Sequence, residues 1–310
     1  MNVIPLAAES LGVRSMATYV ECGETRVLID PGAMLAPSRF GLAPAEEEWE
    51  ALRRANDRIS AYAARASLVF VSHYHQDHFR HDPGLYAGRR LWAKDGTRHI
   101  EGRQAQRAAA LWRALAAHTE PLAAEGRRLE TADTVVKASP ALSHGPDGTP
   151  LGYVVALTIE DRRDGTRFVH ASDVQGPLSP VATAYLVRQR PTLLYLSGPP
   201  AYLEAQLGVG LVDRGIDHLR RIIEQTGCRV ILDHYALRDA AYGERFRRLW
   251  ETGRASTAAG FLGLPDAPLE ARRLDLWLGR RKPPMPLRPS RARGVAPRNS
   301  RPGLRRAKEA

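Results

Sequence analysis

A short run of metal-binding side chains follows an apolar segment in the first third of the chain. Residues 72–80 read SHYHQDHFR, so three histidines and one aspartate fall within six positions. The preceding segment, LVFV at 68–71, is entirely apolar, which is typical of a buried strand. The ligands of a transition metal must converge from several directions, and a tight loop at a strand end allows this more easily than one helix face. The sequence therefore predicts a metal site at the carboxyl end of a buried strand.

The spacing within this run indicates two ions. His73 and His75 are two positions apart, so an extended backbone can turn both to one side. Asp77 and His78 follow where the chain bends, and they can face a second ion. Four such groups exceed what one tetrahedral ion needs from so short a segment. The competing interpretation is a polar loop with solvated histidines, but HxHxDH directly after a buried strand rarely arises by chance.

The positive charge of the chain is concentrated at its carboxyl end. The chain has 310 residues, is 44% hydrophobic and carries a formal charge of +11. Residues 280–310 contain eleven Lys or Arg and one Glu, a net charge of +10, so the rest is close to neutral. This segment, rich in Pro and Arg, buries too little apolar surface to fold alone. We therefore expect one folded domain over residues 1–279 and a disordered basic tail over 280–310.

Cysteine content and the amino terminus favour an intracellular protein. Cys22 and Cys228 lie far apart and form no CxxC pair, which excludes a disulfide framework and a zinc ribbon. The first residues, MNVIPLAAES, lack a basic segment followed by a long apolar one, and no stretch approaches the ~18 apolar residues of a membrane span. We expect a cytoplasmic protein without a membrane partner.

The order of predicted elements indicates a layered α/β architecture. The segments NVIPLA, ATYVEC and TRVLIDPG predict three opening antiparallel strands, and a helical pattern follows from residue 44 to about 66. Another helix is expected over 99–118, and GYVVALTIE and RFVHASD predict two strands around an Asp-Gly hairpin. Helices expected at 181–190, 211–226 and 240–251 then alternate with strands. Such a pattern predicts sheets covered by helices.

Five sequence motifs together resemble the metallo-β-lactamase-fold hydrolase superfamily. These are the HxHxDH run, Asp30 in VLIDPG, His144 in LSHG, Asp173 in HASDVQG and His234 in ILDHY. They occur in that family's order, each at the end of a predicted strand, over residues 1 to about 255. The resemblance implies a four-layer αββα sandwich.

A closer resemblance is to a little-characterised and mainly archaeal branch of predicted metal-dependent hydrolases. It rests on the stretches ESLGVRSMATYVE, SHYHQDH, SDVQGP and YLSGPPAYL. This resemblance implies a fold and a site without naming a substrate. The residues after the metal motif, FRHDPGLY, are more polar than is usual in the superfamily, which indicates a rebuilt loop.

The resemblance assigns the metal ligands residue by residue. It implies that His73, His75 and His144 bind one ion and that Asp77, His78 and His234 bind the other. Asp173 would bridge the two, and Asp30 would orient a ligand loop. The pair of ions would activate a bridging hydroxide near neutral pH, so Asp77 and Asp173 are also the expected catalytic carboxylates. Zinc is the first expectation, and manganese and iron also suit these ligands.

Four further residues are candidate substrate contacts, each with a structural alternative. Ser197 and Gly198 follow an apolar strand, where α/β proteins place ligand loops, but Gly-Pro-Pro is equally a stiff chain reversal. His81 could serve as a general acid, although a histidine in a surface loop is the commoner situation. Tyr235 could donate a proton to a leaving group, although an aromatic residue at a strand end more often serves packing.

The reaction expected first is hydrolysis of a phosphate ester or phosphodiester by a dinuclear metal centre. The substrate would be a small molecule or a nucleic acid, with a weak contact to nucleic acid through the basic tail. Only 28 residues separate His144 from Asp173, which leaves no room there for a large inserted domain. Two alternatives remain open at this point. One is a hydrolase of a small ester, lactone or thioester, and the other is a non-catalytic metal-binding or RNA-binding protein.

Overall fold

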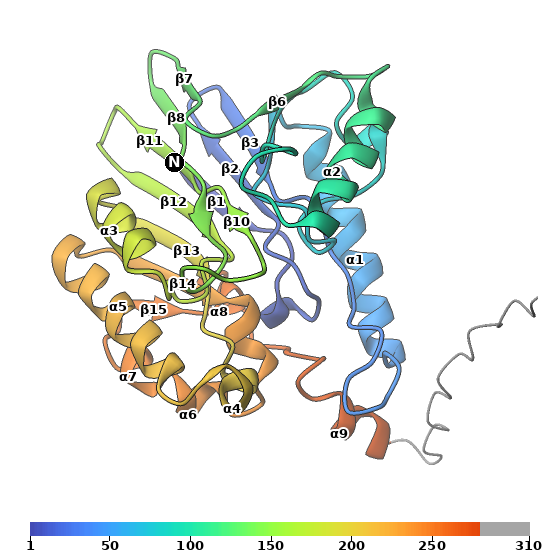
Figure 1. Cartoon of the computed structure of the whole chain (residues 1–310), viewed down its shortest axis with the longest axis vertical. Coiled ribbons are helices and arrows are strands. Elements are labelled where there is room, and N and C mark those ends of the chain that lie inside the picture. The colour runs from blue at the N-terminus through green and yellow to red at the C-terminus, as the bar shows by residue number, and fades with distance from the viewer. Residues whose placement is uncertain (280–310) are drawn as a thin grey trace, which may run out of the picture.

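Two β-sheets pack face to face, and helices cover the outer face of each sheet (Figure 1). The computed structural model describes residues 1–279. This arrangement confirms the four-layer αββα sandwich predicted from the sequence. The prediction of a disordered tail concerns residues 280–310, which lie outside the described residues.

The first sheet has the strand order β1-β2-β3-β4-β5-β6. Strands β1, β2 and β3 pair antiparallel, as the opening segments predict, and β3 to β6 pair parallel. The bounds of these strands are Asn2–Pro5, Thr18–Cys22, Thr25–Ile29, Leu68–Val71, Arg90–Ala93 and Pro121–Ala123. Strands β3 and β4 therefore end side by side at one edge of the sandwich.

The second sheet has the order β15-β14-β13-β12-β11-β8-β7. Strands β12 to β15 run parallel, whereas β7, β8, β11 and β12 pair antiparallel. In chain order from β7 to β15, and including the separate β9–β10 pair, the bounds are Arg128–Glu130, Thr134–Ala138, Leu142–Ser143, Tyr153–Val154, Leu157–Asp161, Arg167–Ser172, Leu193–Ser197, Arg229–Asp233 and Ala255–Ser256.

Four longer helices form the outer layers (Figure 1). Helices α1 (Glu46–Ala63) and α2 (Gly102–Leu115) cover the first sheet, and α3 (Pro180–Gln189) and α5 (Leu211–Thr226) cover the second. The shorter helices α4, α6, α7, α8 and α9 span Glu204–Leu207, Tyr242–Arg245, Arg247–Trp250, Ala258–Phe261 and Arg273–Leu278. The single 3-10 turns η1 to η4 span Glu9–Leu11, Pro83–Leu85, Ala201–Leu203 and His234–Arg238.

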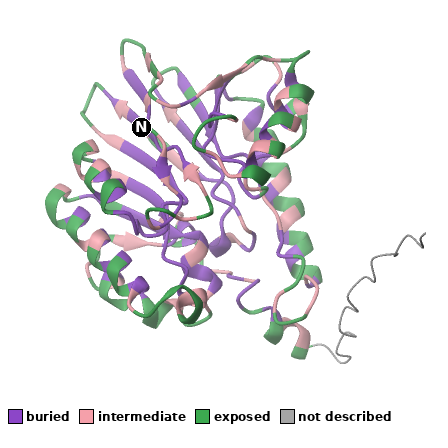
Figure 2. Cartoon of the chain, viewed as in Figure 1, coloured by how far each residue is buried: buried purple, intermediate pink, exposed green. Residues whose placement is uncertain are grey.

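Strand β4 shows why the apolar run before the metal motif is continuous. Leu68 and Phe70 pack into the core between the two sheets, whereas Val69 and Val71 pack into the core beneath α1 and α2. Successive side chains of a strand point to opposite faces, so a strand buried on both faces has no position for a polar residue. Figure 2 shows this burial along the inner strands, with exposed residues on the outer faces of the helices.

The segment GYVVALTIE is divided, although the sequence predicts one strand. The structure gives β10 (Tyr153–Val154) and then β11 (Leu157–Asp161). Between them the Val155 amide donates to the carbonyl of Ser72 at 3.0 Å, and the Ala156 amide donates to Ser139 Oγ at 2.8 Å. The chain therefore leaves one strand and enters the next at the point where it contacts the start of the HxHxDH loop.

The helix predicted over 240–251 is also interrupted. The structure gives α6 and α7 on either side of Phe246, whose backbone leaves the helical region at ψ 18°. The Phe246 side chain is fully buried in the core of the second sheet. The polar and charged residues on either side suit a helix, but the burial of this ring requires the chain to turn.

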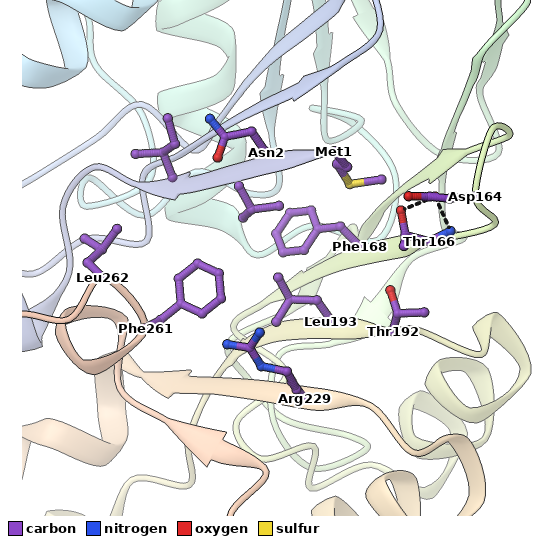
Figure 3. Close-up of a pocket in the computed structure, with 12 residues that line it drawn as sticks. Met1, Asn2, Asp164, Thr166, Phe168, Thr192, Leu193, Arg229, Phe261 and Leu262 are labelled. Carbon is purple, nitrogen blue, oxygen red and sulfur yellow. Dashed lines mark hydrogen bonds between the residues drawn. The ribbon is translucent and has the colours of Figure 1, made fainter.

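A cavity of about 650 Å³ lies at the amino ends of β12, β13 and β14 (Figure 3). Phe168, Leu193 and Phe261 form much of its wall, and Arg229 lies at its side with its guanidinium 5.3 Å from the centre of the Phe261 ring. The candidate metal ligands follow the opposite, carboxyl ends of the strands. This cavity is therefore separate from the candidate site.

Two sequence expectations concern cysteine and the membrane. Cys22 and Cys228 are both buried, and each is a free thiol. Within residues 1–279, no helix combines the length and the apolar character that crossing a bilayer requires.

Candidate metal centre

The candidate ligands gather where strands of both sheets end. His73 follows β4, Asp173 follows β12 and His234 follows β14. Asp30, Ser172 and His234 lie at such strand ends in the left-handed backbone region, with φ of 47°, 50° and 60°. A non-glycine residue held there costs on the order of 1–3 kcal/mol, and such strain concentrates at functional sites. The strand ends are therefore shaped by the site as well as by the fold.

The first group of ligand atoms comes from His73, His75, His144 and Asp173. His73 Nε2 lies 3.0 Å from His75 Nδ1, which in turn lies 3.2 Å from His144 Nε2. Asp173 Oδ2 lies 3.4 Å from His73 Nε2 and 3.2 Å from His144 Nε2. Two tetrahedral ligands at zinc–nitrogen distances of ~2.1 Å would be separated by ~3.4 Å. The donor atoms are thus already spaced as ligands of one ion.

The second group comes from Asp77, His78 and His234, with Asp173 next to them. His234 Nε2 lies 3.6 Å from Asp77 Oδ2 and 3.4 Å from Asp173 Oδ1. His78 Nε2 lies 3.3 Å from Asp173 Oδ2. These separations also match the ligands of a single ion. The structure brings all seven residues predicted as ligands into one cluster.

Asp173 lies between the two groups, and its side chain is fully buried. Among residues 1–279, neither of its carboxylate oxygens has a hydrogen-bond partner, and the same is true of His78 Nε2. Buried polar atoms are nearly always partnered, because an unpaired one costs about 1–3 kcal/mol and a charged one more. These unpaired atoms all point into the cluster. They fit a metal centre, in which each would coordinate an ion.

Buried charge gives a second test of this fit. Four buried carboxylates lie close to ring nitrogens of the cluster histidines. They belong to Glu9, Asp30, Asp77 and Asp173. The buried guanidinium of Arg238 lies among these carboxylates. When all the histidines are neutral, as metal ligands must be, four negative charges and one positive charge leave −3 out of contact with water. Buried charge of one sign is costly unless cations compensate for it. The residues present therefore suit bound divalent cations.

Tyr74 fixes the backbone of the HxHxDH loop from the side opposite the ligands. Its amide donates to Gln104 Oε1 at 2.9 Å, and its buried hydroxyl donates to the carbonyl of Lys94 at 2.6 Å. Trp112 Nε1 donates to the same hydroxyl at 2.8 Å. Because Tyr74 lies between His73 and His75, its anchorage turns both histidines toward the cluster.

Asp30 holds the start of the loop and one ligand ring together. Its Oδ1 accepts from the Ser72 amide at 2.7 Å, and its Oδ2 accepts from Ser72 Oγ at 2.7 Å and lies 2.9 Å from His78 Nδ1. Burial opposes ionisation of Asp30, but the contacts with His78 outweigh it and lower the pKa of the carboxyl. A carboxylate on the outer nitrogen fixes the tautomer that leaves Nε2 free for a metal.

Glu9 orients the His234 ring in the same way as Asp30 orients the His78 ring. The sequence alone does not predict this role of Glu9. Glu9 Oε2 lies 2.8 Å from His234 Nδ1, and Glu9 Oε1 accepts from Arg238 Nε at 2.7 Å. Arg238 Nη2 then lies 3.3 Å from Asp77 Oδ2 and 3.2 Å from His234 Nε2. Glu9 comes from the short turn η1, 225 residues before His234 in the chain. Only the fold brings these side chains together.

His73 and His144 also point their Nε2 atoms into the cluster, and each has a partner on its Nδ1. Ser72 Oγ lies 2.9 Å from His73 Nδ1, and the side-chain amide of Gln175 lies 3.4 Å from His144 Nδ1. Gln175 belongs to the SDVQGP stretch and has a left-handed backbone with φ 55°. Each histidine that points its Nε2 into the cluster therefore has a partner on its Nδ1, which fixes the orientation of the ring. Metal-binding histidines are usually held in this way.

In the metal-free state, burial and neighbouring charges shift the pKa values of the cluster histidines in opposite directions. Burial, together with the neighbouring histidines, lowers the pKa of His73 to about 4 and that of His75 to about 2. Burial would also lower the pKa of His234, but the charges of Glu9 and Asp173 outweigh it and raise the pKa to about 9. His73 and His75 are therefore ready to coordinate at neutral pH, whereas His234 must first lose a proton.

Comparison with known proteins gives the family. Residues 25–185 match the family model described as a β-lactamase superfamily domain. A UPF0282 protein of Thermococcus gammatolerans is 41% identical over 296 residues, covering 89% of this chain and 95% of its own length. A UPF0282 protein of Methanopyrus kandleri is 40% identical over 294 residues, covering 89% and 99%. This chain belongs to the UPF0282 family of the β-lactamase superfamily.

Solved structures confirm the fold of this family member. Unliganded yeast PDE1 matches with a TM-score of 0.50 at 12% identity, over 82% of this chain and 96% of its own. An isothiocyanate hydrolase from Delia radicum gut bacteria matches with a TM-score of 0.51 at 13% identity, over 79% and 94%. At such low identity the likeness extends to the fold alone. Both the superfamily and the archaeal branch predicted from the motifs are confirmed.

The four candidate substrate contacts of this UPF0282 protein lie in different surroundings. Ser197 is buried, and its Oγ accepts from the Gln175 amide at 3.1 Å, so it supports the loop after Asp173. Gly198 packs so closely that an added Cβ would lie 2.4 Å from Ala236 Cβ. His81 is exposed, three residues beyond His78, with its ring 4.8 Å from that of Phe79. None of these three contacts the ligand atoms.

Tyr235, the fourth, lies beside the cluster. Its half-buried ring is 4.7 Å from the His234 ring and 6.2 Å from the His144 ring, and the Arg238 guanidinium lies 4.3 Å from its centre. Burial and the charge of Asp173 raise the pKa of its hydroxyl well above the usual range. The hydroxyl therefore keeps its proton at neutral pH and can donate it.

Proposed function

We propose that this protein is a hydrolase that works with two divalent metal ions on a phosphate ester or phosphodiester. The observation that carries the proposal is the position of Asp173. Its two unpaired, buried oxygens lie between two groups of ligand atoms, one on each side. A carboxylate in this position suits a ligand shared by two adjacent ions.

The residues divide into two ligand sets under this proposal. His73, His75 and His144 would hold one ion, Asp77, His78 and His234 would hold the other, and Asp173 would be a ligand of both. When bound, such a pair of ions supplies an activated water molecule at neutral pH and stabilises negative charge developing on the substrate. Imidazole and carboxylate ligands suit zinc first, and also manganese or iron. Asp77 and Asp173 are the carboxylates on which turnover depends.

Charge around the cluster supports an anionic substrate. The formal charge of −3, which already includes the Arg238 guanidinium 3.3 Å from Asp77 Oδ2, would become +1 with two divalent ions. Tyr235 adds a protonated hydroxyl next to His234 that can serve the leaving group. The net charge and the protonated hydroxyl both suit a phosphate ester.

The test is metal-dependent hydrolysis of bis(p-nitrophenyl) phosphate by the full-length protein loaded with zinc or manganese. Asp173→Asn keeps the size of the side chain but removes its charge, and it should reduce kcat by at least about 1,000-fold. Asp217→Asn is the matched control, because Asp217 is an exposed residue on α5 that pairs with Arg248. Its variant should hydrolyse the ester like the wild type.

Two results would contradict the proposal. Turnover that survived Asp173→Asn would exclude a mechanism that depends on this carboxylate. A metal-loaded wild type that left the phosphodiester intact but hydrolysed p-nitrophenyl acetate or a lactone would assign the centre to small esters instead. Circular dichroism of Asp173→Asn shows whether the variant is folded in the same samples.

A further inference from the structure

A second concave site lies beside the metal-binding loop and has a strongly basic character. It is a hollow of about 370 Å³ lined by His81, Arg103, Gln106, Arg107 and Ala110. Two guanidinium groups, one imidazole and one amide face it, and no carboxylate lines it. A hollow lined in this way favours an anion over a neutral or cationic ligand.

The donors of this hollow are largely uncommitted. Within residues 1–279, the side chains of Arg103 and Gln106 form no hydrogen bond and no ion pair, and His81 has only the ring contact with Phe79. Arg107 donates one N–H to the carbonyl of Tyr74 at 3.1 Å, which leaves its other donors available. The nearby carboxylate of Glu101 caps α2 by accepting from the Arg103 and Gln104 amides, and its charge also interacts with those of Arg103 and Arg107 without forming an ion pair.

The hollow adjoins the loop that carries the candidate metal ligands. Arg103 and Arg107 are four residues apart and therefore lie on one face of α2. Gln104 of the same helix and Arg107 hold the amide and the carbonyl of Tyr74, the residue between His73 and His75. His81 follows His78 by three residues, which limits their Cα separation to ~10 Å. The hollow therefore lies next to the segment that carries four of the candidate ligands.

We propose that this hollow is a subsite for a second phosphate group of the substrate. The inference rests on the proposed phosphoesterase function and narrows its substrate class to molecules with more than one phosphate. A nucleic-acid strand and a nucleotide or inorganic polyphosphate share this chemistry. Arg103 and Arg107 bind the phosphate oxygens through their N–H groups, and His81 and Gln106 donate from the side. The subsite sets affinity and leaves the reaction at the metal centre unchanged.

The test compares full-length wild type with Arg103→Ala and with Arg113→Ala. Arg113 is the matched control, since it is an exposed arginine of α2 outside the hollow. The probes are inorganic tripolyphosphate and a fluorescein-labelled single strand of twelve nucleotides, with binding measured by calorimetry and by anisotropy. Arg107 is left intact because its hydrogen bond supports the ligand loop.

Arg103→Ala should weaken binding of at least one probe by about tenfold, the effect of losing one charged contact worth ~1.4 kcal/mol. It should also lower the slope of log affinity against log salt by about one, while Arg113→Ala stays close to wild type. Loss confined to the strand identifies nucleic acid as the source of the phosphate, and loss with both probes shows that a free polyphosphate suffices.

Unchanged binding of both probes by Arg103→Ala would overturn the subsite, and so would an equal loss in Arg113→Ala. Hydrolysis of bis(p-nitrophenyl) phosphate, which has one phosphate, should be the same in all three proteins. Because binding is measured without turnover, failure of the wild type to hydrolyse this ester would count against the proposed function only. The basic segment 280–310 is present in all three proteins, so its contribution to affinity does not affect the comparison between them.

Discussion

Two carboxylates outside the ligand set stand in equivalent positions. Asp30 contacts the outer nitrogen of His78 at 2.9 Å, and Glu9 contacts that of His234 at 2.8 Å. Asp30 is predictable, because it ends an apolar strand in a recognisable motif. Glu9 is not, because nothing in a short turn near the amino terminus indicates a contact with a residue 225 positions later. Arg238, which joins Glu9 to Asp77, escapes prediction for the same reason.

Replacement of Glu9 should therefore weaken one of the two proposed metal sites. Glu9→Gln removes the negative charge behind His234, and the affinity for the second ion should fall by about 10- to 100-fold. The measurement is competition with a fluorescent zinc chelator. Glu224→Gln, on the exposed side of α5, is the control and should bind as wild type. Wild-type affinity at both sites in Glu9→Gln would show that Glu9 plays no part in metal binding.

Binding of the second ion should depend on pH. In the metal-free protein the pKa of His234 is raised to about 9, and that of His78 is raised well above its usual value, chiefly by Asp173 acting against the effect of burial. A raised pKa means that both rings are protonated at neutral pH, so an ion must displace these protons. Affinity should rise at least about tenfold per pH unit between pH 6 and 8.

Calorimetry in buffers of different ionisation enthalpy counts the protons released. At least one proton should be released at pH 7 as the second ion binds. An affinity that did not change between pH 6 and 8 would contradict the charge state assigned to these histidines. The first ion provides an internal reference, because the pKa values of His73 and His75 are already below this range.

At the scale of the elements, local patterns predict most strands and helices, and long-range contacts decide where they break. The amphipathic pattern over residues 211–226 predicts α5 correctly, because the stripe of buried residues in this helix is local information. The break after β10 is not local, because it depends on the contact between Val155 and Ser72. Helix α9 is likewise held by a distant partner, since Arg273 pairs with Glu48 of α1 at 2.8 Å.

The Arg273–Glu48 pair makes a clear prediction for stability. Both side chains are fully buried, so Arg273→Ala leaves the Glu48 carboxylate without its main partner. The free energy of unfolding should fall by about 3–5 kcal/mol, as measured by urea denaturation. Arg53→Ala, which breaks an exposed pair with Glu46 in the same helix, should cost less than about 1 kcal/mol. Similar losses in the two variants would contradict the importance of burial.

At the scale of the whole molecule, the cluster of candidate metal ligands joins the two sheets. His73, His75, Asp77 and His78 come from the loop after β4 in the first sheet, whereas Asp173 and His234 follow strands of the second. Each candidate ligand could be predicted because the motif that contains it resembles a motif of the metallo-β-lactamase superfamily and its side chain is of a type that binds metals. Their approach to one another, the unpaired oxygens of Asp173 and the basic hollow beside α2 depend on tertiary packing and could not be predicted from local sequence.

Bound metal should accordingly stabilise the fold as a whole. A ligand present at 1,000 times its Kd stabilises the native state by about 4 kcal/mol, provided that it does not bind the unfolded chain. Zinc or manganese should therefore raise the thermal midpoint by several degrees, and EDTA should reverse the shift. Asp173→Asn should largely lose this response. Equal midpoints with metal and with EDTA in the wild type would show that the cluster does not bind these ions.

Metal stoichiometry tests the two-ion centre most directly. The full-length protein is equilibrated with zinc or manganese, dialysed to remove free ions and analysed by inductively coupled plasma mass spectrometry against protein concentration. The account predicts two ions per chain in the wild type and one in His234→Ala, which removes a ligand of the second ion only. One ion or none in the wild type, or two ions retained in His234→Ala, would contradict the dinuclear centre.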